Sequence, residues 1–222
     1  MALPAELRLD NGDSVYQAPG GRLYATPEHV RTERVLLAAT TDRSGEALPP
    51  LLVQRFLDGL RESRIELGAD QAAAVRGILT SGARVETLVG PAGTGKSFVV
   101  GALAKAWSDP AHASDGVERR VFGLATSQIA TEVLSGEGLT ARNVARWLGI
   151  QDRLQRPSSE QRAGDQQWRL RQGDLVVVDE SAMTDTPALA VIHRHVDAAG
   201  RSCCSSVTTA SSPQSVPGEG WT

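Results

Sequence analysis

The sequence contains little cysteine, few aromatic residues and no long apolar run. Its two cysteines, Cys203 and Cys204, are neighbours, and neighbouring cysteines cannot cross-link distant parts of a fold. This excludes a disulfide-rich secreted scaffold. Charged residues occur within the first ten positions, so the start does not resemble a signal peptide. Because no stretch approaches the roughly 20 apolar residues of a membrane span, we expect a cytoplasmic protein without a membrane partner.

Aromatic residues make up only 4% of the 222 residues, so the core has to be built mainly from Ala, Leu and Val. Hydrophobic residues make up 41%, which is enough for a globular core and argues against overall disorder. The formal net charge is -3. That value excludes a uniformly basic protein that coats nucleic acid, but it leaves room for a local basic groove.

The chain divides into three parts. Residues 1–65 contain Asn11-Gly12 and Gly20-Gly21 turns, which predict a small β-ribbon, followed by helices from Thr26-Pro27 onward and over 51–63. Residues 66–200 alternate wholly apolar strands with helices, which predicts an α/β domain whose parallel sheet is covered on both faces. A polar stretch over 153–167 is interpreted as a surface insertion. Residues 201–222 are rich in Ser, Thr and Pro, a composition typical of a disordered tail.

The strongest motif is a complete G-x-x-x-x-G-K-S pattern between an apolar strand and a helix. Its glycines let consecutive backbone N–H groups converge on phosphate oxygens, and the following helix adds its dipole. Lys96 is expected to reach the β- and γ-phosphates of ATP, and the Ser97 hydroxyl to ligate Mg²⁺. An ordinary glycine turn before a helix is the alternative. The residues of the predicted phosphate loop are Gly90, Pro91, Ala92, Gly93, Thr94, Gly95, Lys96 and Ser97.

A second motif follows about 80 residues later, where the apolar run Leu175–Val178 ends in Asp179 and Glu180. An acid at the carboxyl end of a buried strand in such a sheet is placed to hold Mg²⁺ through water, the role predicted for Asp179. Glu180 is predicted to polarise the attacking water as a general base. A strand-end cap is the common alternative for such a pair, but the upstream phosphate loop favours the catalytic interpretation.

The segments LVGPAGTGKS, VFGLATSQIATEVL and LVVVDES together resemble the RecD-like superfamily-one helicases, and most of all the helicase half of conjugative relaxases of the TraI and TrwC type. The resemblance covers residues 66–200 well and residues 14–30 weakly. It implies a RecA-like motor domain, incomplete here, with ATP and Mg²⁺ as ligands and single-stranded DNA as a partner. Ser181 departs from the alanine that the family usually has after its Asp-Glu pair.

The resemblance also assigns roles outside the two motifs. It implies that Gln71 contacts the adenine base, although a glutamine at an exposed helix start is the alternative. Thr126 and Ser127 match the position where these motors touch the DNA backbone, and a helix cap is equally consistent with Ser127. Residues near the DNA path are Asn143, Arg146 and Trp147, of which the tryptophan is more often a packing residue.

Two further observations limit the comparison with relaxases. Relaxase chemistry uses a tyrosine nucleophile and a three-histidine metal site, and none of the four histidines here has that spacing. His193 and His195 lie two residues apart on one expected helix, so they face different sides and are interpreted as surface residues.

The tail carries a separate signal. After Gly200 the helicase family continues with a buried strand and the motif G-D-x-x-Q-L, whereas this chain reads RSCCSSVTTASSPQ. Reverse translation of the tail with G- or C-ending codons, read in a neighbouring frame, gives LLLVGDHRQLPAVG. We therefore expect a change of reading frame near Arg201. It would remove the glutamine that senses the γ-phosphate, leave an exposed sheet edge and end the motor early.

These observations support two functional hypotheses. The first is an ATP-binding fragment of a conjugative relaxase–helicase, with ATP hydrolysis weakened and unwinding lost. The alternative is a nucleotide-dependent module that binds DNA or protein without turnover. The sequence does not determine the oligomeric state.

Overall fold

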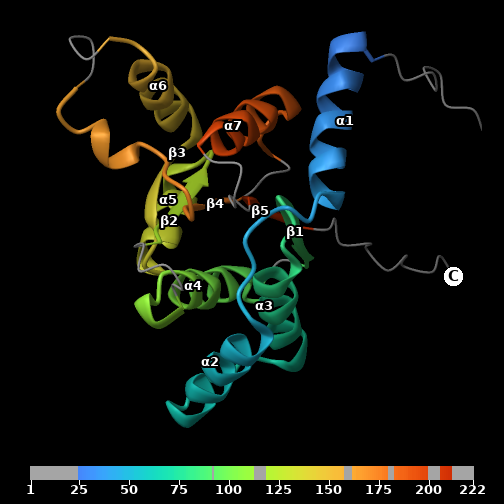
Figure 1. The fold of residues 1–222 in the computed structure, drawn as a ribbon, viewed down its shortest axis with the longest axis vertical. Helices are drawn as coiled ribbons and strands as arrows, with labels where there is room; N and C mark the ends of the chain where they lie inside the picture. The colour runs from blue at the N-terminus through green and yellow to red at the C-terminus, as the bar shows by residue number, and fades with distance from the viewer. Residues whose placement is uncertain are drawn as a thin grey trace, which may run out of the picture.

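The computed structural model describes residues 25–91, 93–112, 119–157, 162–179, 183–199 and 206–211 (Figure 1). The predicted β-ribbon lies outside these residues. The helices are α1 (Pro27–Thr41), α2 (Pro50–Glu62), α3 (Ala69–Ser81), α4 (Lys96–Trp107), α5 (Gln128–Gly136), α6 (Val144–Leu154) and α7 (Thr186–Ala198). The strands are β1 (Val85–Gly90), β2 (Val121–Ala125), β3 (Thr140–Asn143), β4 (Leu175–Val178) and β5 (Ser206–Ser211). None of the described helices combines the length and the apolar character that a membrane crossing requires.

The strands form one parallel sheet in the order β1-β5-β4-β2-β3. β4 is the run Leu-Val-Val-Val, and all four of its residues are buried. β2 alternates its side chains between two cores, since Val121 and Ala125 face one and Phe122 and Leu124 the other. The predicted α/β fold with a parallel sheet covered on both faces is confirmed.

Two helical layers enclose the sheet. One core joins β1, β2 and β4 to α3, α4 and α5, with α2 packed on α3. The other core joins β2 and β4 to α6 and α7, and α1 lies against α7 and β1. Figure 1 shows α2, α3 and α4 on one side of the strands and α1, α6 and α7 on the other. Because every strand is parallel, all carboxyl ends meet at one edge of this sheet.

The strand β5 corrects the expectation for the tail. Ser206–Ser211 pairs in parallel with β1 on one side and with β4 on the other, so the prediction of disorder is wrong for these six residues. The exposed sheet edge expected beside the two motif-bearing strands is likewise absent from the described sheet, because β5 lies between β1 and β4. Composition misled the prediction because it counts hydroxyl residues as polar, although Val207, Thr208 and Thr209 are β-branched and favour strands. The rest of the tail lies outside the described residues.

Two further elements, β3 and α6, have no counterpart in the sequence prediction. β3 is short and forms the other edge of the sheet, where it pairs with β2 from Phe122↔Thr140 to Ala125↔Asn143. Asn143 ends the strand and caps α6, since its Oδ1 accepts hydrogen bonds from the N–H groups of Ala145 (3.0 Å) and Arg146 (3.4 Å).

A buried ion pair fastens the segment before β4 to the start of β2. Asp174 is fully buried and binds the Arg120 guanidinium through both carboxylate oxygens, with Nε to Oδ1 at 3.0 Å. Arg120 also donates to the carbonyls of Gln167 (3.1 Å) and Arg169 (2.8 Å), and the Arg171 N–H donates to Asp174 (2.7 Å). One guanidinium and one carboxylate therefore hold the end of the predicted surface insertion against the sheet.

We expect Asp174→Ala to lower the free energy of unfolding by about 3 kcal/mol, because it leaves the Arg120 charge and the Arg171 N–H without their partner. Urea unfolding followed by circular dichroism measures this change. The matched control is Asp152→Ala, which removes an exposed pair with Arg156 and should change stability by no more than about 0.5 kcal/mol. Equal small losses in both variants would contradict this account of the buried pair.

Candidate functional site

The predicted phosphate loop joins the carboxyl end of β1 to the first residue of α4. Gly93 and Gly95 have φ angles of +78° and +73°, in the left-handed region that side chains other than hydrogen disfavour. A Cβ at Gly95 would also lie 2.7 Å from the Gln71 amide nitrogen. Glycine is thus required at position 95 for two reasons: the backbone has a positive φ, and any side chain would collide with Gln71. Ala92 lies outside the described residues.

Lys96 bends back over this loop. Its Nζ donates hydrogen bonds to the carbonyl oxygens of Gly90 and Pro91, both at 2.8 Å. The Thr94 hydroxyl donates to the same Pro91 carbonyl at 2.8 Å. The ammonium group thus lies within the loop that is predicted to receive phosphate, and a phosphate oxygen has to compete with two carbonyls for it.

Gln71 links the loop to α3. Its Oε1 accepts from the Gly68 N–H at 2.9 Å, which caps the helix, and its Nε2 donates to the Thr94 carbonyl at 2.9 Å. The structure therefore brings Gln71 to the phosphate loop, and its predicted contact with adenine stays a prediction. This contact with the loop is one that sequence reasoning missed, since the predicted role was adenine binding alone.

Asp179 lies at the same edge of the sheet as the loop, directly after β4. Its N–H donates to the Leu124 carbonyl at 2.8 Å, which extends the pairing of β4 with β2 by one residue. Ser97 is the second residue of α4 and is partly buried. Glu180 and Ser181 lie outside the described residues, so the predicted general base remains a prediction.

The residues predicted to meet DNA follow β2 and β3 at this edge. Ser127 caps α5, since its hydroxyl oxygen accepts from the Ala130 N–H at 3.1 Å, so the cap alternative is confirmed. Asn143 donates from Nδ2 to the Thr126 carbonyl at 2.7 Å. This hydrogen bond ties the ends of the two neighbouring strands together.

Trp147 and His193 are both core residues. Trp147 is completely buried, which confirms the packing alternative. The interpretation of His193 as a surface residue is wrong, since it is 9% exposed, and burial lowers the pKa of its imidazole. His193 follows the buried Ile192 on α7, where α1 covers the helix, and the sequence pattern of α7 alone did not reveal that cover. His195 is partly exposed and meets the Trp147 ring edge-on.

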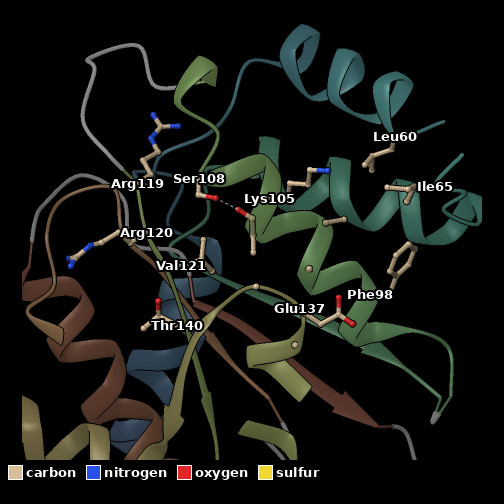
Figure 2. Close-up of a pocket in the computed structure, with 15 residues that line it drawn as sticks. Leu60, Ile65, Phe98, Lys105, Ser108, Arg119, Arg120, Val121, Glu137 and Thr140 are labelled. Carbon is tan, nitrogen blue, oxygen red and sulfur yellow. Dashed lines mark hydrogen bonds between the residues drawn. The ribbon is translucent and has the colours of Figure 1, made fainter. Parts of the chain in front are cut away.

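A cleft of about 580 Å³ runs along α4. Figure 2 shows Leu60 and Ile65 on one side of it, Glu137 and Thr140 on another, and Phe98 and Lys105 from α4 itself. A Cβ at Gly101 would collide with the Glu137 carboxylate, so this mid-helix glycine lets the end of α5 approach α4. None of the described loop residues, 90, 91 and 93–97, lines the cleft, which is therefore separate from that part of the phosphate loop.

Comparison with known families decides what kind of domain carries this loop. A family model described as an AAA domain matches residues 66–205, more than half of the chain. The chain belongs to the AAA domain family. Its loop is accordingly that of a P-loop ATPase, and membership of this family supports nucleotide binding. A comparison with curated proteins gives no significant match.

We expect Gln71→Ala to weaken the binding of ATP and GTP alike, because the hydrogen bond to Thr94 shapes the AAA domain's loop whichever base is present. One such bond is worth about 1 kcal/mol, so both affinities should fall about fivefold. Titration calorimetry with each nucleotide tests this, with Gln54→Ala on α2 as the matched control. A loss confined to ATP would contradict it and assign Gln71 to the base alone.

Proposed function

We propose that this AAA domain is the ATP-binding part of a DNA helicase motor of the kind found in conjugative relaxases. The observation that carries the proposal is the loop itself: Gly93 and Gly95 are left-handed, and Lys96 begins α4 at the carboxyl edge of a parallel sheet. The resemblance of the motif segments to RecD-like helicases supports the finer assignment.

The residues present suit Mg-ATP. The N–H groups at the start of α4 and the positive end of its dipole favour phosphate, and Lys96 supplies a cation already inside the loop. Mg²⁺, when bound, neutralises charge on the phosphates. Ser97 and Asp179 are the residues proposed to hold it, and Glu180 is proposed as the general base that polarises the attacking water.

Single-stranded DNA is the proposed macromolecular partner. Thr126 and Ser127 follow β2, and Asn143 ends β3, at the edge of the sheet that also carries the phosphate loop. Asn143 donates a hydrogen bond to the Thr126 carbonyl, and Ser127 caps α5. These two hydrogen bonds hold the ends of β2 and β3 in a fixed arrangement. The alternative, a binding module that responds to nucleotide without turnover, uses the same edge.

We further propose that the reading frame changes near Arg201. A reverse translation of the tail with G- or C-ending codons yields, in a neighbouring frame, the strand and the G-D-x-x-Q-L motif of the helicase family, and the match to the AAA domain ends at residue 205. A polypeptide of these 222 residues would lack the glutamine that senses the γ-phosphate. We therefore expect weak hydrolysis and no unwinding from it.

We expect Lys96→Ala to lower the affinity for Mg-ATP between about 10- and 100-fold, because it removes a charge-assisted hydrogen bond to phosphate. Fluorescence titration with a labelled ATP analogue measures the loss. Lys105→Ala is the matched control, since Lys105 lies on the same helix but lines the separate cleft. Unchanged affinity in Lys96→Ala would contradict the ATP site, and strong DNA-stimulated hydrolysis by the 222-residue chain would contradict the loss of activity.

The nucleotide sequence tests the change of frame. We expect the codons for residues 202–212, read two bases out of register, to encode Leu-Leu-Leu-Val-Gly-Asp followed by a Gln-Leu pair. Sequencing of independent clones from codon 196 onward provides this measurement. Codons that yield no such motif in either neighbouring frame would refute the proposal.

A further inference from the structure

The positive charge of the chain is concentrated in one segment. Residues 142–171 contain seven arginines and three acidic residues, a net charge of +4 in a chain of net charge -3. All other residues together therefore carry -7. The arginines are Arg142, Arg146, Arg153, Arg156, Arg162, Arg169 and Arg171.

The two acids of this segment that the structure describes, Asp152 and Asp165, are both paired within it. Asp165 accepts from Arg153 Nε at 2.9 Å and from its second guanidinium nitrogen at 2.7 Å. The Arg153 guanidinium thereby lowers the pKa of Asp165 to about 2. Asp152 binds Arg156 at 2.6 Å. Among the described residues, no ion pair involves the other five arginines. We call these five the arginine face: Arg142, Arg146, Arg162, Arg169 and Arg171.

The short helix η4 (Gln166–Trp168) packs on α6, and Arg142, Arg162 and Arg169 lie beside it. Arg146 is exposed on α6, and Arg171 is exposed three residues after η4. Gln151 of α6 donates to the Trp168 carbonyl at 2.8 Å, which fixes η4 against α6. The Arg142 guanidinium lies 4.5 Å from the centre of the Trp168 ring. Trp168 is the residue directly before Arg169 in the sequence. The Arg162 N–H donates to Asp165 at 3.0 Å, which brings Arg162 beside the Arg153 pair.

The same surface offers no apolar anchor. Trp147 and Trp168 are 0% and 3% exposed, so neither ring is open to a partner. The large hydrophobic residues that are exposed in the described chain all lie outside 142–171: Val35, Leu37, Leu51, Val89, Phe98, Ile129, Val133 and Met183. Protein interfaces depend on buried aromatic or aliphatic anchors, whereas binding to a phosphate backbone depends on the cations themselves. The composition of this surface therefore favours nucleic acid over an acidic protein.

We propose that the arginine face binds the phosphate backbone of single-stranded nucleic acid without regard to sequence. The choice of partner rests on the proposed function, but the surface is a separate one. α6 packs on the opposite face of the sheet from α4, and of the arginine face only Arg146 was expected near DNA from the resemblance. The other four extend the contact to η4 and the segment that leads into β4. The surface thus holds a strand whether or not the phosphate loop is occupied.

The test is a triple substitution, R162E/R169E/R171E, measured by fluorescence anisotropy with a labelled 20-mer of thymidine over a range of salt concentrations. Each phosphate contact contributes about 0.7 to the slope of log K against log salt for single strands, so the slope should fall by about 2. At low salt the affinity should fall at least tenfold. The matched control, R31E/R34E/R55E, changes the net charge equally on α1 and α2 and should leave the slope nearly unchanged.

Four further measurements make the result decisive. R162Q/R169Q/R171Q removes the charges without reversing them and should give the same loss of slope, which guards against misfolding of the first variant. An unchanged slope in both variants, or equal losses in the control, overturns the proposal. So does a wild-type chain that binds poly-glutamate but not the oligonucleotide. ATP binding should survive in the arginine variants, and oligonucleotide binding in Lys96→Ala, so failure of this surface and failure of the ATP site are distinguishable.

Discussion

The fold depends on the need of buried backbone groups for hydrogen-bonding partners. β4 is apolar along its whole length and is covered by helices on both faces, so each of its N–H and C=O groups must be paired within the sheet. β2 pairs with one side of β4 and β5 with the other. This requirement explains why a strand of modest composition is found beside β4. It also fixes the edge at which Asp179 and the phosphate loop both lie.

The elements that the sequence predicted are those whose own residues determine them. α3, α4, α5 and α7 have start signals or apolar periodicity, and β1, β2 and β4 are apolar runs of strand length. β3 is only four residues long with no fully buried position, so its pattern carries no signal. β5 and the burial of His193 depend on neighbours supplied by distant parts of the chain. Local patterns do not contain such information.

The site shows the same division. The loop was predictable because phosphate chemistry prescribes glycine and lysine at fixed spacing, and two of its glycines are left-handed as such a loop requires. The hydrogen bond between Gln71 and Thr94 joins residues 23 positions apart in the sequence, and the two carbonyls that hold Lys96 are specific to the folded loop. Asp152 pairs with Arg156 and Asp165 with Arg153, which leaves the positive charge of the arginine face without acidic partners among the described residues. These pairings could not be inferred without coordinates.

The conformation of the Lys96 side chain, which is folded back onto the loop, affects which ligands the loop selects. On the proposed function, its ammonium group has to give up two short hydrogen bonds to carbonyl oxygens in order to bind a phosphate. A polyphosphate compensates for the two lost hydrogen bonds by forming charge-assisted hydrogen bonds with the ammonium group. A nucleoside has no phosphate and cannot form them. The resting loop thereby sets an energetic threshold that screens out compounds with the right base and no phosphates. Selectivity of this kind is built into the domain before any contact with the base is made.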